Sequence, residues 1–160
     1  MNRTSLKLLA LMLLAVLLVA CGGGGGDDTI KIGLNLELTG NIPKVGEHSR
    51  VAAEMFAEEV NAAGGLDVGG QKYMIQLVTE DNNATAEGAT AVANKLITQD
   101  EVLVLVGPNA SVAAVPAGEV ANNLETPMIS PWSTNPSTTA GRPWVFRAPF
   151  IDSFQGPILA

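Results

Sequence analysis

Val102-Leu103-Val104-Leu105-Val106-Gly107-Pro108-Asn109-Ala110-Ser111 is the stretch that decides the fold. Its first five residues form an unbroken apolar run, which is typical of a strand buried on both faces of a parallel sheet. The run stops at a glycine-proline pair, and a helical pattern begins directly after Ser111. A buried strand that leads through a short polar loop into a helix predicts one unit of an α/β sheet.

The same unit recurs along the chain. We expect strands at 30–36, 73–79, 102–106, 127–130 and 144–147, and helices at 46–63, 86–98, 112–124 and from 153 onward. Gly64-Gly65 predicts the end of the first helix, and Thr85 or Asn83 is expected to cap the second. Residues 67–70 are expected to form a tight loop. The alternation predicts an α/β fold with a doubly wound, mostly parallel sheet.

Polar residues follow two neighbouring strands of this sheet. Asn109, Ala110 and Ser111 come after strand 102–106, and Trp132, Ser133 and Thr134 come after strand 127–130. Ligands of open α/β sheets bind at the carboxyl edge, where these residues are expected to meet. Ser111 also begins a helix, whose free N–H groups and dipole favour an anion. We therefore expect a pocket for a small anionic or zwitterionic solute.

The N-terminus has the pattern of a targeting segment. Arg3 and Lys7 precede the short apolar stretch 8–19, which ends in Leu18-Val19-Ala20-Cys21 and resembles a bacterial lipobox. We expect residues 1–21 to be a lipoprotein signal peptide with Cys21 as the lipidated residue, and residues 22–29 to be a flexible Gly/Asp tether. The alternative is an ordinary secretory signal in which Cys21 has no role.

Composition argues against several classes of function. With 9 Lys+Arg against 16 Asp+Glu, the formal charge is −7, and the sequence has no basic patch for nucleic acid. Glu80-Asp81 is expected to be solvated, so we predict no metal site there. We also expect no cofactor. His48 is the only histidine, and no Gly-x-Ser-x-Gly motif is present. We therefore expect a protein that is not an enzyme; a hydrolase built on Ser111 and His48 is the enzymatic alternative.

Several short motifs together resemble one family. They are Ile30-Lys31-Ile32-Gly33, Leu38-Thr39-Gly40, Val60-Asn61-Ala62-Ala63-Gly64-Gly65, Gly70-Gln71-Lys72-Tyr73, Val106-Gly107-Pro108, Pro127-Met128-Ile129-Ser130-Pro131, Thr134-Asn135-Pro136 and Phe146-Arg147. In order and spacing they are similar to the type I periplasmic solute-binding proteins, the branched-chain amino-acid (Leu/Ile/Val) receptors of ABC transporters. The resemblance covers residues 30–160.

The resemblance implies two α/β lobes with a solute bound between them. Residues 30–148 would be the N-terminal lobe, and residues 149–160 would be the hinge and the start of a second lobe, so we expect the chain to be part of a longer protein. Residues matching Ser111, Trp132 and Thr134 would hold the α-carboxylate and part of the ammonium of the solute. Val45 stands where the family often has an aromatic residue that lines the pocket, and Trp132 replaces a small residue.

The resemblance also implies a function. We expect an extracytoplasmic lipoprotein, on the periplasmic or outer face of a membrane, that binds a small amino acid or related amide or carboxylate and delivers it to an ABC permease. The alternatives are a solute sensor that presents its ligand to a receptor or kinase, the lipid-anchored hydrolase, and a complete domain with a structural or adhesive role.

Overall fold

The computed structural model of the chain describes residues 28–159. The predicted signal peptide, Cys21 and most of the predicted tether lie outside the described residues. The elements in chain order are β1 (Thr29–Leu36), α2 (Pro43–Ala62), β2 (Leu66–Val68), β3 (Gln71–Asp81), α3 (Ala86–Thr98), β4 (Val104–Val106), α4 (Ser111–Asn123), β5 (Met128–Ser130), the 3-10 helix η1 (Pro136–Thr138), β6 (Val145–Arg147) and α5 (Asp152–Leu159).

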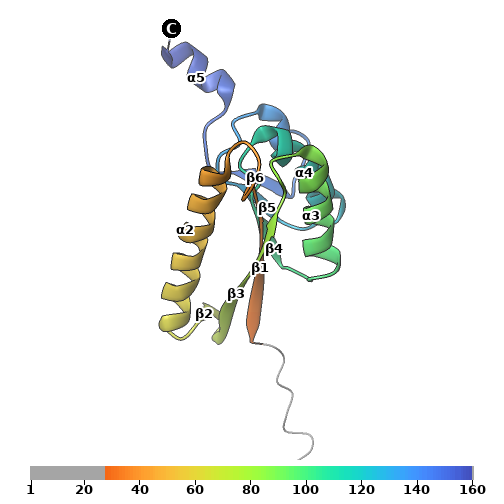
Figure 1. Ribbon diagram of the computed structural model, residues 1–160. Coiled ribbons are helices and arrows are strands. Elements are labelled where there is room, and N and C mark those ends of the chain that lie inside the picture. The colour runs from red at the N-terminus through yellow and green to blue at the C-terminus, as the bar shows by residue number, and fades with distance from the viewer. Residues whose placement is uncertain (1–27, 160) are drawn as a thin grey trace, which may run out of the picture.

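These strands form one sheet with the order β2-β3-β1-β4-β5-β6. All pairs are parallel except β2 with β3. The prediction of an α/β fold with a mostly parallel sheet is confirmed. In Figure 1, α2 lies on one side of the sheet and α3 and α4 lie on the other, while α5 extends away from these layers.

The hairpin of β2 and β3 was not predicted. Residues 67–70 were expected to form only a loop, but Leu66 pairs with Tyr73 and Val68 pairs with Gln71. All three residues of β2 are exposed, so the strand has no buried face that would produce an alternation of apolar and polar residues in the sequence. β3 is also longer than expected and begins at Gln71.

The core lies between the sheet and the pair α3 and α4. Leu105, Met128 and Val145 point into it from three adjacent strands. The facing helices contribute alanines that have no exposed surface: Ala89, Ala93, Ala113, Ala117 and Ala121. Small side chains let the two helices pack closely on each other and on the sheet. Thr85 caps α3 as predicted, because its hydroxyl accepts the N–H of Gly88 at 3.0 Å.

The opposite face of the sheet is only partly covered. Helix α2 packs on β1 and β3, while Ile129 of β5 and Phe146 of β6 remain exposed. The expectation that the whole run 102–106 is buried on both faces was wrong for Leu103, which is 62% exposed. Leu103 precedes β4, whose pairing with β1 begins only at Val104, so it lies at the amino end of the strand.

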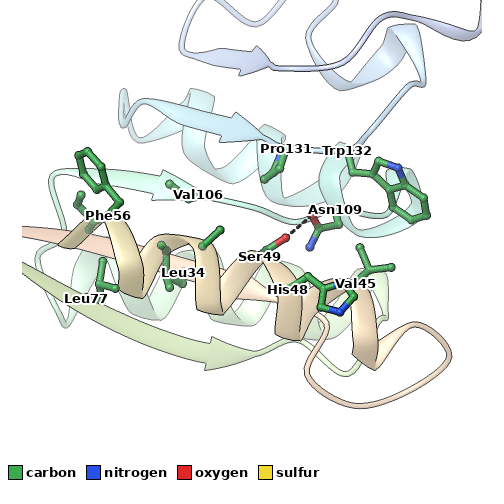
Figure 2. Close-up of a pocket in the computed structure, with 13 residues that line it drawn as sticks. Leu34, Val45, His48, Ser49, Phe56, Leu77, Val106, Asn109, Pro131 and Trp132 are labelled. Atoms are coloured by element: carbon green, nitrogen blue, oxygen red, sulfur yellow. Dashed lines mark hydrogen bonds between the residues drawn. The ribbon is translucent and has the colours of Figure 1, made fainter. Parts of the chain in front are cut away.

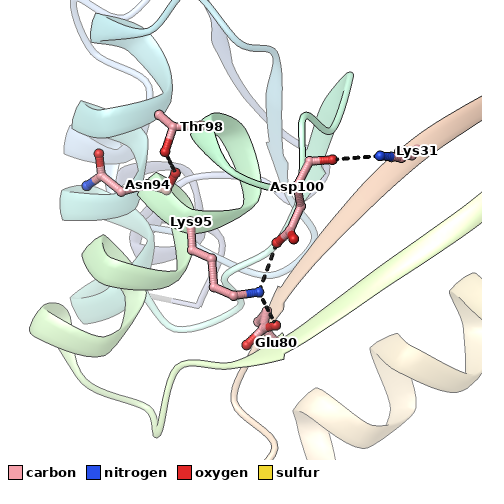
Figure 3. A network of polar contacts seen from close by, with 6 residues as sticks. All are labelled: Lys31, Glu80, Asn94, Lys95, Thr98 and Asp100. Carbon is pink, nitrogen blue, oxygen red and sulfur yellow. Dashed lines mark hydrogen bonds and ion pairs between the residues drawn. The ribbon is translucent and has the colours of Figure 1, made fainter.

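A polar network fixes the C-terminal end of α3 to the sheet (Figure 3). The Lys95 ammonium donates to Glu80 Oε1 at 2.6 Å and to Asp100 Oδ2 at 2.9 Å. The hydrogen bond to Glu80, followed by the one to Asp100, raises the pKa of Lys95. Lys31 on β1 also donates to the main-chain oxygen of Asp100 at 3.1 Å. None of the helices in residues 28–159 has the length and apolar composition to cross a membrane.

Candidate functional site

The site lies where the sheet changes its winding direction. β1 leads into α2 on one face, and its neighbour β4 leads into α4 on the other. Such a switch point leaves a crevice at the carboxyl ends of the strands. The loop after β4 turns sharply at Gly107, whose φ is +94°, and a Cβ there would lie 2.2 Å from the main-chain oxygen of Asn35. Glycine is therefore required for this loop to lie against β1.

A cavity of about 490 Å³ opens at the start of α4. It is lined by Asn109, Ala110, Ser111, Trp132, Thr134, Phe150, Asp152 and Gln155. The structure thus brings together five of the seven residues that the sequence proposed as ligand contacts. Two segments supply them: the loop that leads into α4 together with the first residue of α4, and the loop after β5. β4, which precedes the first segment, and β5 are neighbours in the sheet.

Three hydroxyl groups are linked behind this cavity. Ser133 Oγ donates to Ser111 Oγ at 2.9 Å and lies 2.6 Å from Thr138 Oγ1. Because the single hydroxyl proton of Ser133 is donated to Ser111, Thr138 must be the donor in its hydrogen bond with Ser133. The proton of Ser111 then stays available for an acceptor in the cavity.

Ser133 differs in position from the other proposed contacts. Its side chain is 1% exposed and does not line the cavity. Its N–H donates to Ser130 Oγ at 3.1 Å, and Ser130 Oγ donates to the Pro108 oxygen at 2.5 Å. Ser133 therefore holds the two loops together and orients Ser111 from behind.

A second cavity of about 740 Å³ runs from the same edge down the α2 face of the sheet. Val45 and His48 of α2 lie at the end near Trp132, and Phe56 and Leu77 lie at the far end (Figure 2). Most of its wall is apolar: Ile32, Leu34, Val45, Ala52, Ala53, Phe56, Leu77, Val106, Pro131 and Trp132. It shares Asn109 and Trp132 with the first cavity. An amphipathic solute therefore meets polar groups at one end and an apolar wall beside them.

The hydrolase alternative has no geometric support among residues 28–159. His48 lines the apolar cavity, whereas Ser111 lines the polar one. The hydroxyl of Ser111 is paired with Ser133, and no hydrogen bond joins it to His48.

The acids at the end of β3, expected to be solvated, are half-buried and hydrogen-bonded to protein groups. Glu80 pairs with Lys95. Asp81 Oδ1 accepts the N–H groups of Leu38, Thr39 and Asn83, and its Oδ2 accepts the Thr39 hydroxyl at 2.6 Å. Burial opposes ionisation of Asp81, but these hydrogen bonds outweigh it and hold its pKa below the ordinary value. Within the described part of the chain, no group of three acidic, histidine or cysteine residues is arranged to hold a metal ion.

Sequence reasoning missed two groups of residues at the site. Phe150, Asp152 and Gln155 line the polar cavity from the segment that was assigned to the hinge and the start of a second lobe. The Asp152 N–H donates to the main-chain oxygen of Thr134 at 3.0 Å. Glu37 is fully buried beneath the loop before α4. Its position directly after β1, at a carboxyl end, was the one signal available in the sequence.

Comparison with known proteins identifies the family to which this chain is similar. Residues 29–156 match the periplasmic binding protein family. The leucine-, isoleucine-, valine-, threonine-, and alanine-binding protein of Pseudomonas aeruginosa is 36% identical over 132 residues, which cover 82% of this chain and 34% of that protein. The chain spans about a third of the length of the curated relatives it matches.

Solved structures agree with this. The branched-chain amino acid transporter substrate binding protein LivJ from Streptococcus pneumoniae, in complex with isoleucine, is similar with a TM-score of 0.76 and 38% identity; 82% of this chain and 36% of that chain are covered. A solute binding protein of an ABC transporter from Rhodopseudomonas palustris, in complex with 3,4-dihydroxy benzoic acid, has a TM-score of 0.67 and 27% identity, with 78% and 32% covered. Both of those ligands carry a carboxylate group.

Proposed function

The chain belongs to the periplasmic binding protein family, and from this premise we propose that it forms the N-terminal lobe of an extracytoplasmic receptor for a small amino acid. The solute would be of the branched-chain type or a related amide or carboxylate, and an ABC permease would receive it. Residues 30–148 are the lobe in this proposal, and residues 149–160 begin the hinge to a second lobe. Closure of the second lobe over the solute requires that the solute bind the closed state more tightly.

One observation carries this proposal: a polar and an apolar cavity share a wall. The Ser111 hydroxyl and the first N–H groups of α4 are suited to a carboxylate. Thr134 lines the same cavity and offers a hydroxyl that both donates and accepts. Val45 and Trp132 border the apolar cavity beside it, where an aliphatic side chain would be removed from water.

Membrane attachment through Cys21 is part of the same proposal. It rests on the pattern Leu18-Val19-Ala20-Cys21 after a short apolar stretch. Incorporation of labelled fatty acid, lost in Cys21→Ser, is the measurement that tests it.

The solute assignment is tested by thermal unfolding of the natural gene product without its leader. Pools of aliphatic, aromatic and polar amino acids and of small carboxylates are added in turn. A ligand at a hundred times its dissociation constant stabilises the folded state by about 2.7 kcal/mol, which shifts the midpoint by several degrees. We expect the aliphatic pool to give this shift. A folded protein that responds to no pool contradicts the proposal.

Ser111→Ala locates the binding site. Loss of one hydrogen bond to a charged carboxylate costs about 1.5–3 kcal/mol, so we expect the affinity to fall roughly tenfold to a hundredfold. Ser137→Ala is the matched control, because Ser137 is exposed and outside both cavities. Equal affinities of the two variants, measured by calorimetry, would remove Ser111 from the site.

A further inference from the structure

Glu37 is a buried carboxylate whose hydrogen bonds all go to one loop. Its side chain has no exposed surface, and none of the ion pairs among the described residues includes it. Oε1 accepts the main-chain N–H of Asn109 at 3.0 Å and that of Ala110 at 2.9 Å. Oε2 accepts the Asn109 side-chain amide at 2.9 Å. Removing a carboxylate from water costs free energy, and hydrogen bonds to both of its oxygens offset this cost.

These bonds determine which donors at the start of α4 remain free. Ala110 is the N-cap residue and has no side-chain acceptor of its own. Its main-chain oxygen accepts the N–H groups of Ala113 and Ala114 at 3.0 and 2.8 Å. Glu37 engages the N–H groups of Asn109 and Ala110. Within residues 28–159, the N–H groups of Ser111 and Val112 have no protein acceptor.

Glu37 is also fixed from the side of α2. Gly46 packs so closely that a Cβ there would lie 2.2 Å from the Glu37 main-chain oxygen. Ser49 of α2 donates to Asn109 Oδ1 at 3.0 Å, on the same amide whose nitrogen donates to Glu37 (Figure 2). β1, α2 and the loop before α4 therefore meet at one carboxylate.

We propose that Glu37 is a positioning residue for solute binding, an inference that rests on the proposed function. By engaging the N–H groups of Asn109 and Ala110, its carboxylate holds the first turn of α4 in place. The N–H groups of Ser111 and Val112 and the hydroxyl of Ser111 are then left as a preorganised set of donors for the carboxylate of the solute. Glu37 itself does not touch the solute.

The test compares two ligands that differ at the carboxylate, L-leucine and L-leucinamide, by calorimetry on the full-length natural gene product. Glu37→Gln keeps one oxygen for the main-chain N–H groups but places an amide donor against that of Asn109; Glu37→Ala removes both acceptors. Asn61→Ala is the control, because it removes two partly buried hydrogen bonds to the main chain of Ile75 at the other end of α2.

We expect the affinity for leucine to fall by about three- to tenfold in Glu37→Gln and by more than about tenfold in Glu37→Ala, while that for leucinamide changes by less than about twofold. Asn61→Ala should lower stability and leave the ratio of the two affinities unchanged. Amide hydrogen exchange of Asn109 and Ala110, whose N–H groups Glu37 accepts, should quicken in the Glu37 variants and not in Asn61→Ala.

The outcomes separate this inference from the proposed function. A wild-type protein that binds both ligands equally overturns the proposed carboxylate site and this inference with it. A wild-type protein that prefers leucine, with the same ratio of affinities in Glu37→Gln, overturns the role of Glu37 alone. If Glu37→Ala does not fold, Glu37→Gln decides the question.

Discussion

At the scale of single residues, the partly exposed carboxylate of Asp81 holds the loop that leads from β1 into α2. Asp81, at the end of β3, accepts N–H groups from Leu38 and Thr39 of this loop as well as from Asn83 beside it. The loop connects Glu37 to α2, so both sides of the switch point depend on carboxylates that accept main-chain N–H groups. Neither carboxylate has a cationic partner among the described residues.

Asp81→Asn should lower stability in a way that depends on pH. The asparagine keeps an oxygen for the N–H groups but loses the charge, and because Asp81 is partly exposed we expect a loss of about 1 kcal/mol at neutral pH. The folded-state pKa of Asp81 lies below the ordinary value of 3.8. The contribution of the charge is therefore present above that value and is lost as the pH falls through the folded-state pKa.

Urea unfolding of wild type and variant between pH 7 and pH 3 measures this difference. Asp67→Asn, on the exposed strand β2, is the control, because its carboxylate accepts one main-chain N–H, from Gly70 at 2.9 Å, and otherwise makes only an exposed ion pair with Lys72 at 3.7 Å, which contributes little to stability. A difference between wild type and Asp81→Asn that stays constant down to the lowest pH would contradict the assignment.

At the scale of elements, the packing of α3 on α4 depends on alanines. Ala93 and Ala117 are fully buried in this layer. Added methyl groups in such a tightly packed layer force shifts of backbone and side chains. The two helices can therefore pack closely because alanine side chains end at Cβ.

Ala117→Leu should destabilise the protein by about 1–3 kcal/mol because there is no space for the larger side chain. Ala91→Leu, on the exposed side of α3, is the matched control and should change stability by less than about 0.5 kcal/mol. Denaturant unfolding measures both. Equal effects of the two substitutions would show that the alanine layer is not tightly packed.

The sequence predicted most elements because their patterns are local. The apolar faces and the cap of α3 are visible within a window of a dozen residues, and the predicted bounds 86–98 agree with the structure. β2 was missed because three exposed residues carry no pattern. Glu37 was missed because its partners are 72 and 73 residues away, and only the order of the strands shows that the two segments meet.

The same limit applies to the site. Ser111 and Thr134 lie in the segments that follow two neighbouring strands, so the topology predicts that they meet, and Trp132 lines the same cavity. The inward position of Ser133 depends on side-chain packing, which the sequence does not display. Phe150, Asp152 and Gln155 reach the cavity through the path of the chain after β6. The sequence predicts a helix from residue 153 onward but not the direction in which this segment leaves the sheet.

At the scale of the whole molecule, the described residues cover the two faces of the sheet unequally. Side chains alternate along a strand, and the neighbours of the buried Leu105, Met128 and Val145 point to the α2 side. There Ile129 is 38% and Phe146 is 54% exposed. Ile129 pairs with Val106, which lines the apolar cavity, and Phe146 pairs with Ile129. Parallel sheets are normally covered on both faces.

A polypeptide of residues 28–160 should therefore bind the dye anilinonaphthalene sulfonate and self-associate. The double substitution Ile129→Lys and Phe146→Lys should reduce dye fluorescence severalfold, as measured by titration, and should shift the sedimentation profile toward monomer. Met55→Lys is the control, because Met55 is exposed on α2. Dye binding that is equal in all three proteins would show that this face is not the apolar surface involved.

The central position of β1 affects how the chain acquires its fold during synthesis. β1 is the first of the described strands to be made, yet Thr29 pairs with Met74, and Ile32 pairs with Val104. A ribosome adds about 5–20 residues per second, so the central strand is exposed for several seconds before both neighbours exist. The antiparallel hairpin of β2 and β3 needs no such wait, because its paired residues lie close together in sequence. Translation rate and early chaperone contact thus bear most directly on the residues of β1.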